Sequence, residues 1–381
     1  MARTRRLLII IAIAVAIFGV VMVYSASHYS ANRNHGDPFF FMRKQIVGVI
    51  VGAVTMISVS MMPVRLFKKY AVWIALFGGL LLVIVLIPAF SISAYGARRW
   101  INIPFIGSLA PGEVVKFTFV IFMAYILDKI RDRQKNLFNT ALVFIVFISY
   151  AALIMFQPNF STVMCLAFIL ALMLFIGGLR KRDFFVLSIP AVLTVPALII
   201  AEPYRLRRLT AYLNPWESPL GEGYQLIQSL YSLAGGGLFG VGLFNSRQKY
   251  LFLPFSESDF IFSIIVEELG IFGAAMLMAA FALMIILIIK IALRAKDRFS
   301  CYLASGIACI IAVQVLVNIA VVSGTIPPTG LPLPFVSAGN TNLMVFFAGI
   351  GVALRISKES EDAAGTFELP IKKRNREGYK F

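Results

Sequence analysis

Ten long apolar stretches limit the folds that this chain can adopt. A helix needs about 20 mostly apolar residues to cross the hydrocarbon core of a bilayer, and each stretch is roughly that long. The predicted spans lie near residues 7–26, 45–62, 70–90, 112–127, 137–155, 160–179, 184–202, 260–291, 300–323 and 340–356. We therefore predict an all-α polytopic membrane protein with about ten transmembrane helices and a large extracytoplasmic loop between helices seven and eight.

Composition supports this fold class. Of the 381 residues, 60% are hydrophobic and 14% charged, whereas soluble domains carry about 25% charged residues. The three cysteines, Cys165, Cys301 and Cys309, have no spacing typical of a metal site or a disulfide framework. A soluble domain, a zinc site and an oxidised scaffold are therefore not indicated.

The net charge of +17 is compatible with nucleic acid, anionic lipid or an acidic substrate as partner. Its distribution favours membrane topology instead. Cations cluster in short segments between spans, such as 129–135 and 180–182, as the positive-inside rule expects of cytoplasmic loops. We predict cytoplasmic N- and C-termini and no nucleic-acid partner.

Three predicted outer segments are longer than ordinary turns: residues 91–112, 203–259 and 323–342. The longest is rich in Gly, Pro and turn formers, which predicts a folded loop that lies on or dips into the outer bilayer surface. The third contains Pro327–Ser337, which cannot be regular helix and is expected to line an outer cavity. We predict one membrane domain over 1–357 and a disordered cytoplasmic tail over 358–381.

Several ionisable residues lie where charge is costly. Asp259 begins the eighth span, where it is either a helix cap or a functional acid or base. Glu267 and Glu268 lie deeper in that span, so a partner or a polar cavity is expected for them. Glu113 and Lys116 are spaced i, i+3 and either neutralise one another or serve a site.

Cations on the outer side break the inside bias. Guanidinium groups, such as those of Arg205 and Arg208, match phosphate oxygens, so a pyrophosphate ligand would explain them; lipid headgroups are the alternative. Trp100, beside Arg99, suits the membrane interface or stacking on a sugar. Together these features favour an amphiphile with an anionic head over a small solute.

Several motifs, taken in order, resemble those of the SEDS family of polytopic membrane proteins, represented by FtsW, RodA and SpoVE. The resemblance covers nearly the whole chain up to about Arg355. It rests on Gly96–Ile101, Asn214–Trp216, Gly223–Gln225, Leu253–Pro254, Asp259–Phe262, Glu267–Gly270, Thr329–Gly330 and Leu333–Ser337. Asn214–Trp216 is more similar to the division and sporulation branch, which favours an FtsW-like role.

The resemblance implies a peptidoglycan glycosyltransferase of the bacterial cytoplasmic membrane, acting at the division septum. It would polymerise lipid II with inversion and release undecaprenyl pyrophosphate. The family's catalytic aspartate maps onto Asp259. The expected substrate-binding residues are Arg99, Trp100, Glu113, Lys116, Arg205, Arg208, Gln225, Lys249 and Ser337.

A class B penicillin-binding protein and other division proteins are the partners that the resemblance implies. No metal ligands are assigned, although a divalent cation, Mg²⁺ or Mn²⁺, is a cofactor to consider. Asn159, Phe255 and Asn340 depart from the usual Gln-Pro-Asp, Leu-Pro-Glu and Ser-Tyr-Gly-Gly patterns. Two other hypotheses remain open at this point: a lipid II flippase or transporter, and a non-catalytic divisome scaffold.

Overall fold

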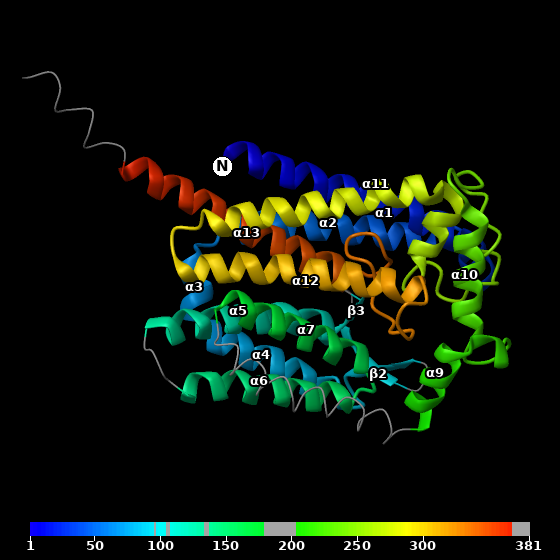
Figure 1. Cartoon of the computed structure of the whole chain (residues 1–381), viewed down its shortest axis with the longest axis horizontal. Helices are drawn as coiled ribbons and strands as arrows, with labels where there is room; N and C mark the ends of the chain where they lie inside the picture. Colours follow the sequence, from blue (N-terminus) through cyan, green and yellow to red (C-terminus); the bar gives the residue numbers. More distant parts are fainter. Residues whose placement is uncertain (95–96, 104–106, 133–136, 179–202, 368–381) are drawn as a thin grey trace, which may run out of the picture.

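The computed structural model describes residues 1–94, 97–103, 107–132, 137–178 and 203–367. Its long helices run side by side in one bundle, coloured along the chain in Figure 1. The elements are α1 (Ala2–His35), α2 (Phe40–Met61), α3 (Val64–Lys69), α4 (Ala71–Ile84), β1 (Ser91–Ala94), β2 (Ala97–Ile103), β3 (Gly107–Leu109), α5 (Pro111–Asp132), α6 (Leu137–Met155), α7 (Phe160–Ile176), α9 (Pro203–Leu213), the 3₁₀ turn η1 (Pro215–Glu217), α10 (Tyr224–Gly236), α11 (Ile261–Leu293), α12 (Arg298–Val322) and α13 (Asn340–Phe367).

The predicted spans agree closely with these helices. Nine of the ten overlap a described helix, and the seventh, 184–202, lies outside the described residues. Five of the described helices are each long and apolar enough to cross a membrane: α1, α2, α11, α12 and α13. Shorter apolar stretches lie in α4, α6 and α7. The mainly α-helical membrane architecture is confirmed.

The bundle packs around α12, which contacts α5, α7, α11 and α13. Small residues let other helices approach closely, as they do in membrane proteins generally. On α2, a methyl group added at Gly52 would lie 2.4 Å from the Phe347 ring of α13. The α2–α13 pair is therefore held by close packing.

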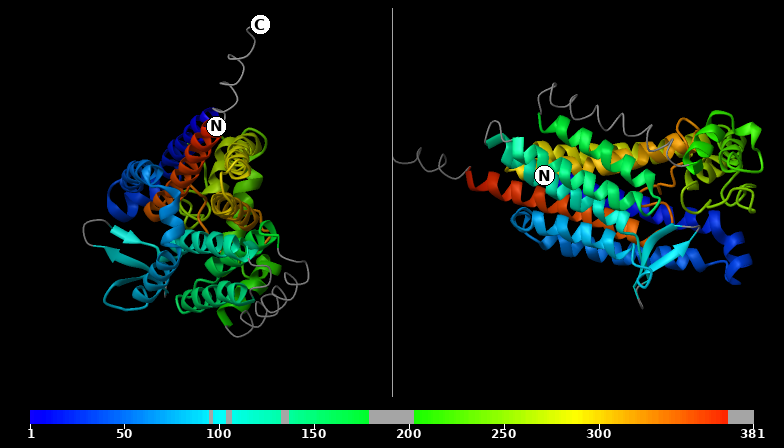
Figure 2. Two further views of the ribbon diagram at one scale, coloured as in Figure 1. Left: turned by 90° about the vertical axis from the view of Figure 1, so that its left-hand side faces the viewer. Right: turned by 90° about the horizontal axis from the view of Figure 1, so that it is seen from below.

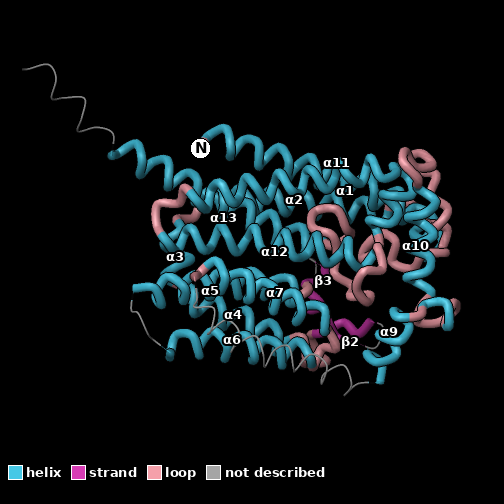
Figure 3. Tube along the Cα trace, in the orientation of Figure 1, coloured by secondary structure: helices cyan, strands magenta, loops and turns pink. Residues whose placement is uncertain are grey.

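The two ends of the bundle differ in kind. The start of α1 and the last described turns of α13 lie at the same end (Figure 1). Figure 3 shows the loops gathered at the opposite end, which we call the loop end; it also carries the strands, α9 and α10. The three long predicted loops therefore meet in space.

The first of these loops contains a small sheet that the all-α prediction lacked. Strands β1, β2 and β3 pair antiparallel in that order, and Figure 2 shows them at the side of the bundle. Ile101 of β2 clusters with Leu81 and Val85 at the end of α4. This apolar contact fixes the sheet to the bundle.

Two helix predictions need correction. The eighth span is interrupted: Gly270 of α11 has φ 70° and ψ −175°, a conformation that suits glycine. The tail expected to be disordered from residue 358 instead continues α13 as helix to Phe367. Glu359 stabilises this extension, since it accepts hydrogen bonds from Arg355 Nε (2.8 Å) and Val64 N (3.0 Å). Residues 368–381 lie outside the described residues.

Candidate active site

Asp259 lies at the loop end, just before α11. The N-cap of that helix is Phe260, with no side-chain capping bond, so the interpretation of Asp259 as a cap is wrong. Its backbone carbonyl accepts from Asn318 Nδ2 of α12 at 2.9 Å, and the same nitrogen donates to Leu331 O at 2.8 Å. One buried amide thus joins Asp259 to the segment Pro327–Ser337, which we call the Pro-rich loop.

Further hydrogen bonds hold the Pro-rich loop against the chain before α11. Gln314 Nε2 donates to Pro332 O at 2.8 Å. Ser337 Oγ donates to Ser258 O at 2.6 Å and accepts from Leu333 N at 2.8 Å. Ser337, predicted to bind substrate, is buried and already uses its hydroxyl within the protein, so we assign it to loop support.

The Asp259 carboxylate lies against the Pro-rich loop at a glycine. Gly330 has φ +73°, and a Cβ placed there would lie 3.2 Å from Asp259 Oδ2. A side chain at this position is therefore both strained and in close contact with the carboxylate. The glycine leaves the carboxylate room to face a ligand.

Arg99 of strand β2 lowers the pKa of Asp259 through its positive charge. Trp100 pairs with Ile92 and Arg98 with Ser93, so Arg99 is the extra residue of a β-bulge, a feature that re-aims side chains. Its guanidinium donates to the carbonyls of Gln157, at 3.4 Å from Nε, and of Pro158. The bulge explains how a strand residue reaches the α6–α7 turn.

Arg208 of α9 also lowers the pKa of Asp259 through its positive charge. Its Nη1 donates to Pro328 O of the Pro-rich loop at 3.4 Å. Gln225 and Glu222 line one small hollow together with Arg208 and Pro328. The structure thus brings the predicted residues Arg208 and Gln225 together; it describes Arg205 only as part of the α9 backbone.

Burial, a hydrogen bond and nearby charges together set the pKa of Asp259. Burial raises the pKa of Asp259 to about 6, against the lowering effect of the Ser258 hydrogen bond. The Glu257 carboxylate raises it further, and the Arg99 and Arg208 guanidinium groups lower it. Burial also raises the pKa of Glu257. A carboxyl whose pKa lies near the working pH suits general acid–base chemistry.

Two polar atoms beside Asp259 are buried without a hydrogen-bond partner among the described residues: Thr329 Oγ1 and Asn318 Oδ1. Buried polar groups are rarely left unpaired, because each costs free energy. Both atoms are therefore available to hydrogen-bond with a polar ligand.

Glu113 and Lys116 form the predicted pair, with Lys116 Nζ 2.8 Å from Glu113 Oε2. Lys116 also donates to Gln314 Oε1, and Gln314 in turn holds Pro332. Lys116 is fully buried. Both residues therefore lie beneath the Pro-rich loop and connect it to α5.

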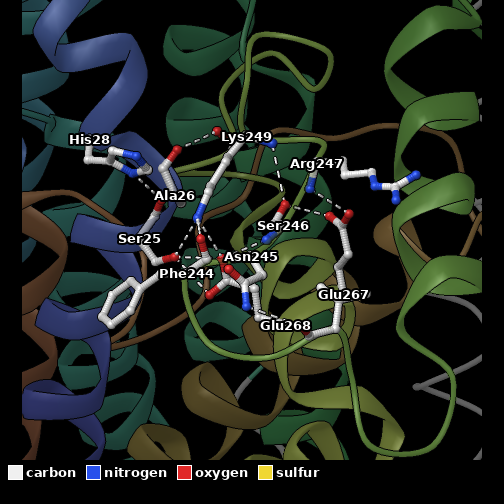
Figure 4. Close-up of polar contacts among 12 residues, drawn as sticks. Ser25, Ala26, His28, Phe244, Asn245, Ser246, Arg247, Lys249, Glu267 and Glu268 are labelled. Carbon is white, nitrogen blue, oxygen red and sulfur yellow. Dashed lines mark hydrogen bonds and ion pairs between the residues drawn. The ribbon is translucent and has the colours of Figure 1, made fainter.

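Lys249, predicted to bind substrate, lies in a buried ion-pair network. Figure 4 shows it between α1 and α11, where its Nζ lies 3.1 Å from Glu268 Oε1 and 3.4 Å from Ser25 Oγ. Glu267 accepts from Ser246 Oγ (2.5 Å) and Arg247 N (2.8 Å). Glu267 and Glu268 thus have the partners that the sequence required. We assign Lys249 to this buried network rather than to ligand binding.

The described residues contain no group of three or more His, Cys, Asp or Glu side chains able to hold a metal ion. Glu257 and Asp259 are two nearby carboxylates. Magnesium sites of this kind complete their coordination with substrate phosphate oxygens and water.

Sequence reasoning missed three residues of the site: Glu257, Gln314 and Asn318. The last two carried a signal, since they are amides four residues apart in an apolar span and so lie on one helix face. Glu257 carried none beyond its nearness to Asp259. No described contact joins Trp100 to Asp259, and Trp100 lies in the sheet as the partner of Ile92.

Fold and site together define a polytopic membrane protein with a partly buried, cation-flanked carboxyl at one end of its bundle. A family model described as "Cell cycle protein" (FtsW, RodA, SpoVE) matches residues 5–362. The chain belongs to this family and is an integral membrane protein.

Individual relatives agree along nearly the full chain. Stage V sporulation protein E of Bacillus subtilis is 37% identical over 93% of this chain and 97% of the relative. A probable peptidoglycan glycosyltransferase FtsW of Coxiella burnetii is 38% identical over 93% and 96%.

Solved structures give the same picture. A chain from work described as "Structural coordination of polymerization and crosslinking by a peptidoglycan synthase complex" matches with a TM-score of 0.75 and 25% identity, covering 93% of this chain and 97% of that one. The rod shape determining protein RodA of Thermus thermophilus matches with a TM-score of 0.69 at 23% identity, over 93% and 96%, which supports the fold.

Proposed function

We propose that this protein is a peptidoglycan glycosyltransferase that polymerises lipid II during cell division, with Asp259 as its catalytic base. The observation that carries the proposal is the Asp259 carboxyl, with its pKa raised to about 6, flanked by Arg99 and Arg208. Relatives named as probable peptidoglycan glycosyltransferase FtsW support the reaction class.

In this mechanism the Asp259 carboxylate takes the proton of the acceptor sugar's 4-hydroxyl. The hydroxyl oxygen attacks the anomeric carbon of the donor, and the bond from that carbon to undecaprenyl pyrophosphate breaks with inversion. Arg99 and Arg208 stabilise the negative charge that develops on the leaving pyrophosphate. Thr329 Oγ1, which has no hydrogen-bond partner among the described residues, donates to a sugar oxygen.

Orientation and partners follow from the same proposal. The loop end faces the outside of the cytoplasmic membrane, both termini face the cytoplasm, and the protein acts at the septum. A class B penicillin-binding protein is the partner, and support comes from the structural match to a peptidoglycan synthase complex. A divalent cation, if used, would be held by the Glu257 and Asp259 carboxylates and would supply further positive charge there.

The departure from the family pattern at Asn159 leaves this mechanism intact. Asn159 caps α7, its side chain accepting from Thr162 N at 3.3 Å, a role that an amide fills as well as a carboxylate. Asp259 itself is retained. We therefore expect an active enzyme.

The test is glycan-strand synthesis by the purified protein, alone and with its penicillin-binding partner. We expect strands longer than the disaccharide unit. Vesicles that carry the protein, and that move labelled lipid II across the bilayer without making strands, would instead identify a transporter. Neither activity in folded protein would favour the scaffold hypothesis.

Gly330→Ala is expected to lower the rate of strand synthesis about tenfold, because the added methyl group crowds the Asp259 carboxylate and misplaces it. Gly36→Ala is the matched control: Gly36 has φ +68°, and a Cβ there meets nothing within 4 Å. Both variants carry similar backbone strain. Equal rates in the two variants would contradict the contact between Gly330 and the catalytic carboxylate.

A further inference from the structure

A second hollow lies beside the first, between α9 and the turn that follows it. One wall carries Arg207 and Thr210, which are spaced i, i+3 on α9, and Asn214, the residue that follows this helix. The other wall carries Glu217 and Glu222. The hollow therefore presents both signs of charge to whatever enters it.

Two of the charged side chains that line this hollow form no ion pair within the described part of the protein. The Glu217 carboxylate accepts from Asn214 Nδ2 at 2.6 Å. Within the described ranges, neither the Arg207 guanidinium nor the Glu222 carboxylate has an ion-pair or side-chain hydrogen-bond partner. An unpaired cation and an unpaired anion thus line one hollow without neutralising each other, as a site for a zwitterionic group requires.

The second hollow adjoins the first, which Arg208 lines. Glu222 and Ala211 line both hollows, and the first also contains Arg208. Arg208 in turn acts on the Asp259 carboxylate. From Arg207 to Leu213 the helix extends about 9 Å at 1.5 Å per residue. A ligand that contacts Arg208 in the first hollow can therefore place a second part along α9.

We propose that this second hollow binds a zwitterionic group, one ammonium and one carboxylate, on the peptide carried by the lipid-linked disaccharide. Glu222 and Glu217 receive the ammonium, and Arg207 receives the carboxylate. This inference rests on the proposed function, because it assigns the peptide end of the same substrate. A zwitterionic phospholipid headgroup carries similar chemistry, and the test separates the two sources.

The experiment compares strand synthesis and substrate binding for two lipid-linked disaccharides. One carries a peptide with a free side-chain ammonium, and in the other that ammonium is acetylated. For the wild type, acetylation is expected to raise KM and the dissociation constant about fivefold, as loss of a partly exposed charged hydrogen bond does. Glu222→Gln should raise KM and the dissociation constant for the substrate with the free ammonium. Acetylation of that substrate should then raise neither value further in this variant.

Arg33→Gln is the control: Arg33 is an exposed cation at the end of α1 and should respond to acetylation as the wild type does. A Glu222→Gln effect that is equal for the two substrates would overturn the proposal. So would an effect that appears only in vesicles containing phosphatidylethanolamine, which would identify the lipid headgroup as the ligand. If the wild type makes no strands, the proposed function fails, and the binding measurements alone decide the subsite.

Discussion

Lys249→Met is expected to destabilise the folded protein by about 3–5 kcal/mol, the usual cost of breaking a buried ion pair from one side. Lys249 and Glu268 are both fully buried in their side chains and lie 3.1 Å apart. Without the ammonium, Glu268 keeps a negative charge in an apolar setting. Thermal unfolding in detergent, followed by loss of monodisperse protein, measures the effect.

Two further variants identify the cause. Lys249→Met combined with Glu268→Gln removes both charges and should recover most of the lost stability, since replacing both members of a buried pair is often close to neutral. Lys44→Met, at an exposed lysine of α2, should change stability little. If the double variant is as unstable as the single one, the uncompensated carboxylate is not the reason.

Asp259→Asn is expected to lower the rate of strand synthesis about a thousandfold, within the range that a general base contributes. Asparagine has nearly the same shape but cannot take the proton. Folding should be preserved: because burial raises the pKa of Asp259 to about 6, keeping this carboxyl ionised at neutral pH costs folding free energy. The neutral amide removes that cost, so the melting temperature should be equal or higher.

Lys249→Met is the comparison for Asp259→Asn. It is expected to lower the stability of the folded protein, and to lower activity only through that loss of folded protein. A variant that binds substrate, unfolds at the wild-type temperature and makes no strands would assign the loss to chemistry. Strand synthesis at the wild-type rate by Asp259→Asn would remove Asp259 from the mechanism.

The spans were predictable because the bilayer imposes a simple rule of length and apolarity. Nine predicted spans coincide with helices, the seventh lying outside the described residues. The break in α11 was not predicted. It depends on loop amides that bond to helix carbonyls, such as Val241 N to Glu267 O at 2.9 Å, and no local pattern reveals such a partner.

The site was predictable in its residue types and less so in its geometry. The Arg99 and Arg208 guanidinium groups lower the pKa of Asp259, while the catalytic roles that the resemblance implies for these residues stay predictions. The bulge that re-aims Arg99 depends on a sheet that forms by pairing three short strands. The sequence also placed Lys249 among the ligand-binding cations, because charge alone does not show that Glu268 lies beside it.

The most direct test of the central claim is the pH dependence of strand synthesis by the wild type and by Glu257→Gln. Asp259 acts as a base only when deprotonated, so the wild-type rate should fall about tenfold per pH unit below pH 6, as for titration of a single group. Since Glu257 raises the pKa of Asp259, its removal should move this fall to lower pH. A wild-type rate that stays constant well below pH 6, or a fall that Glu257→Gln leaves unmoved, would contradict the assignment of Asp259 as the catalytic base.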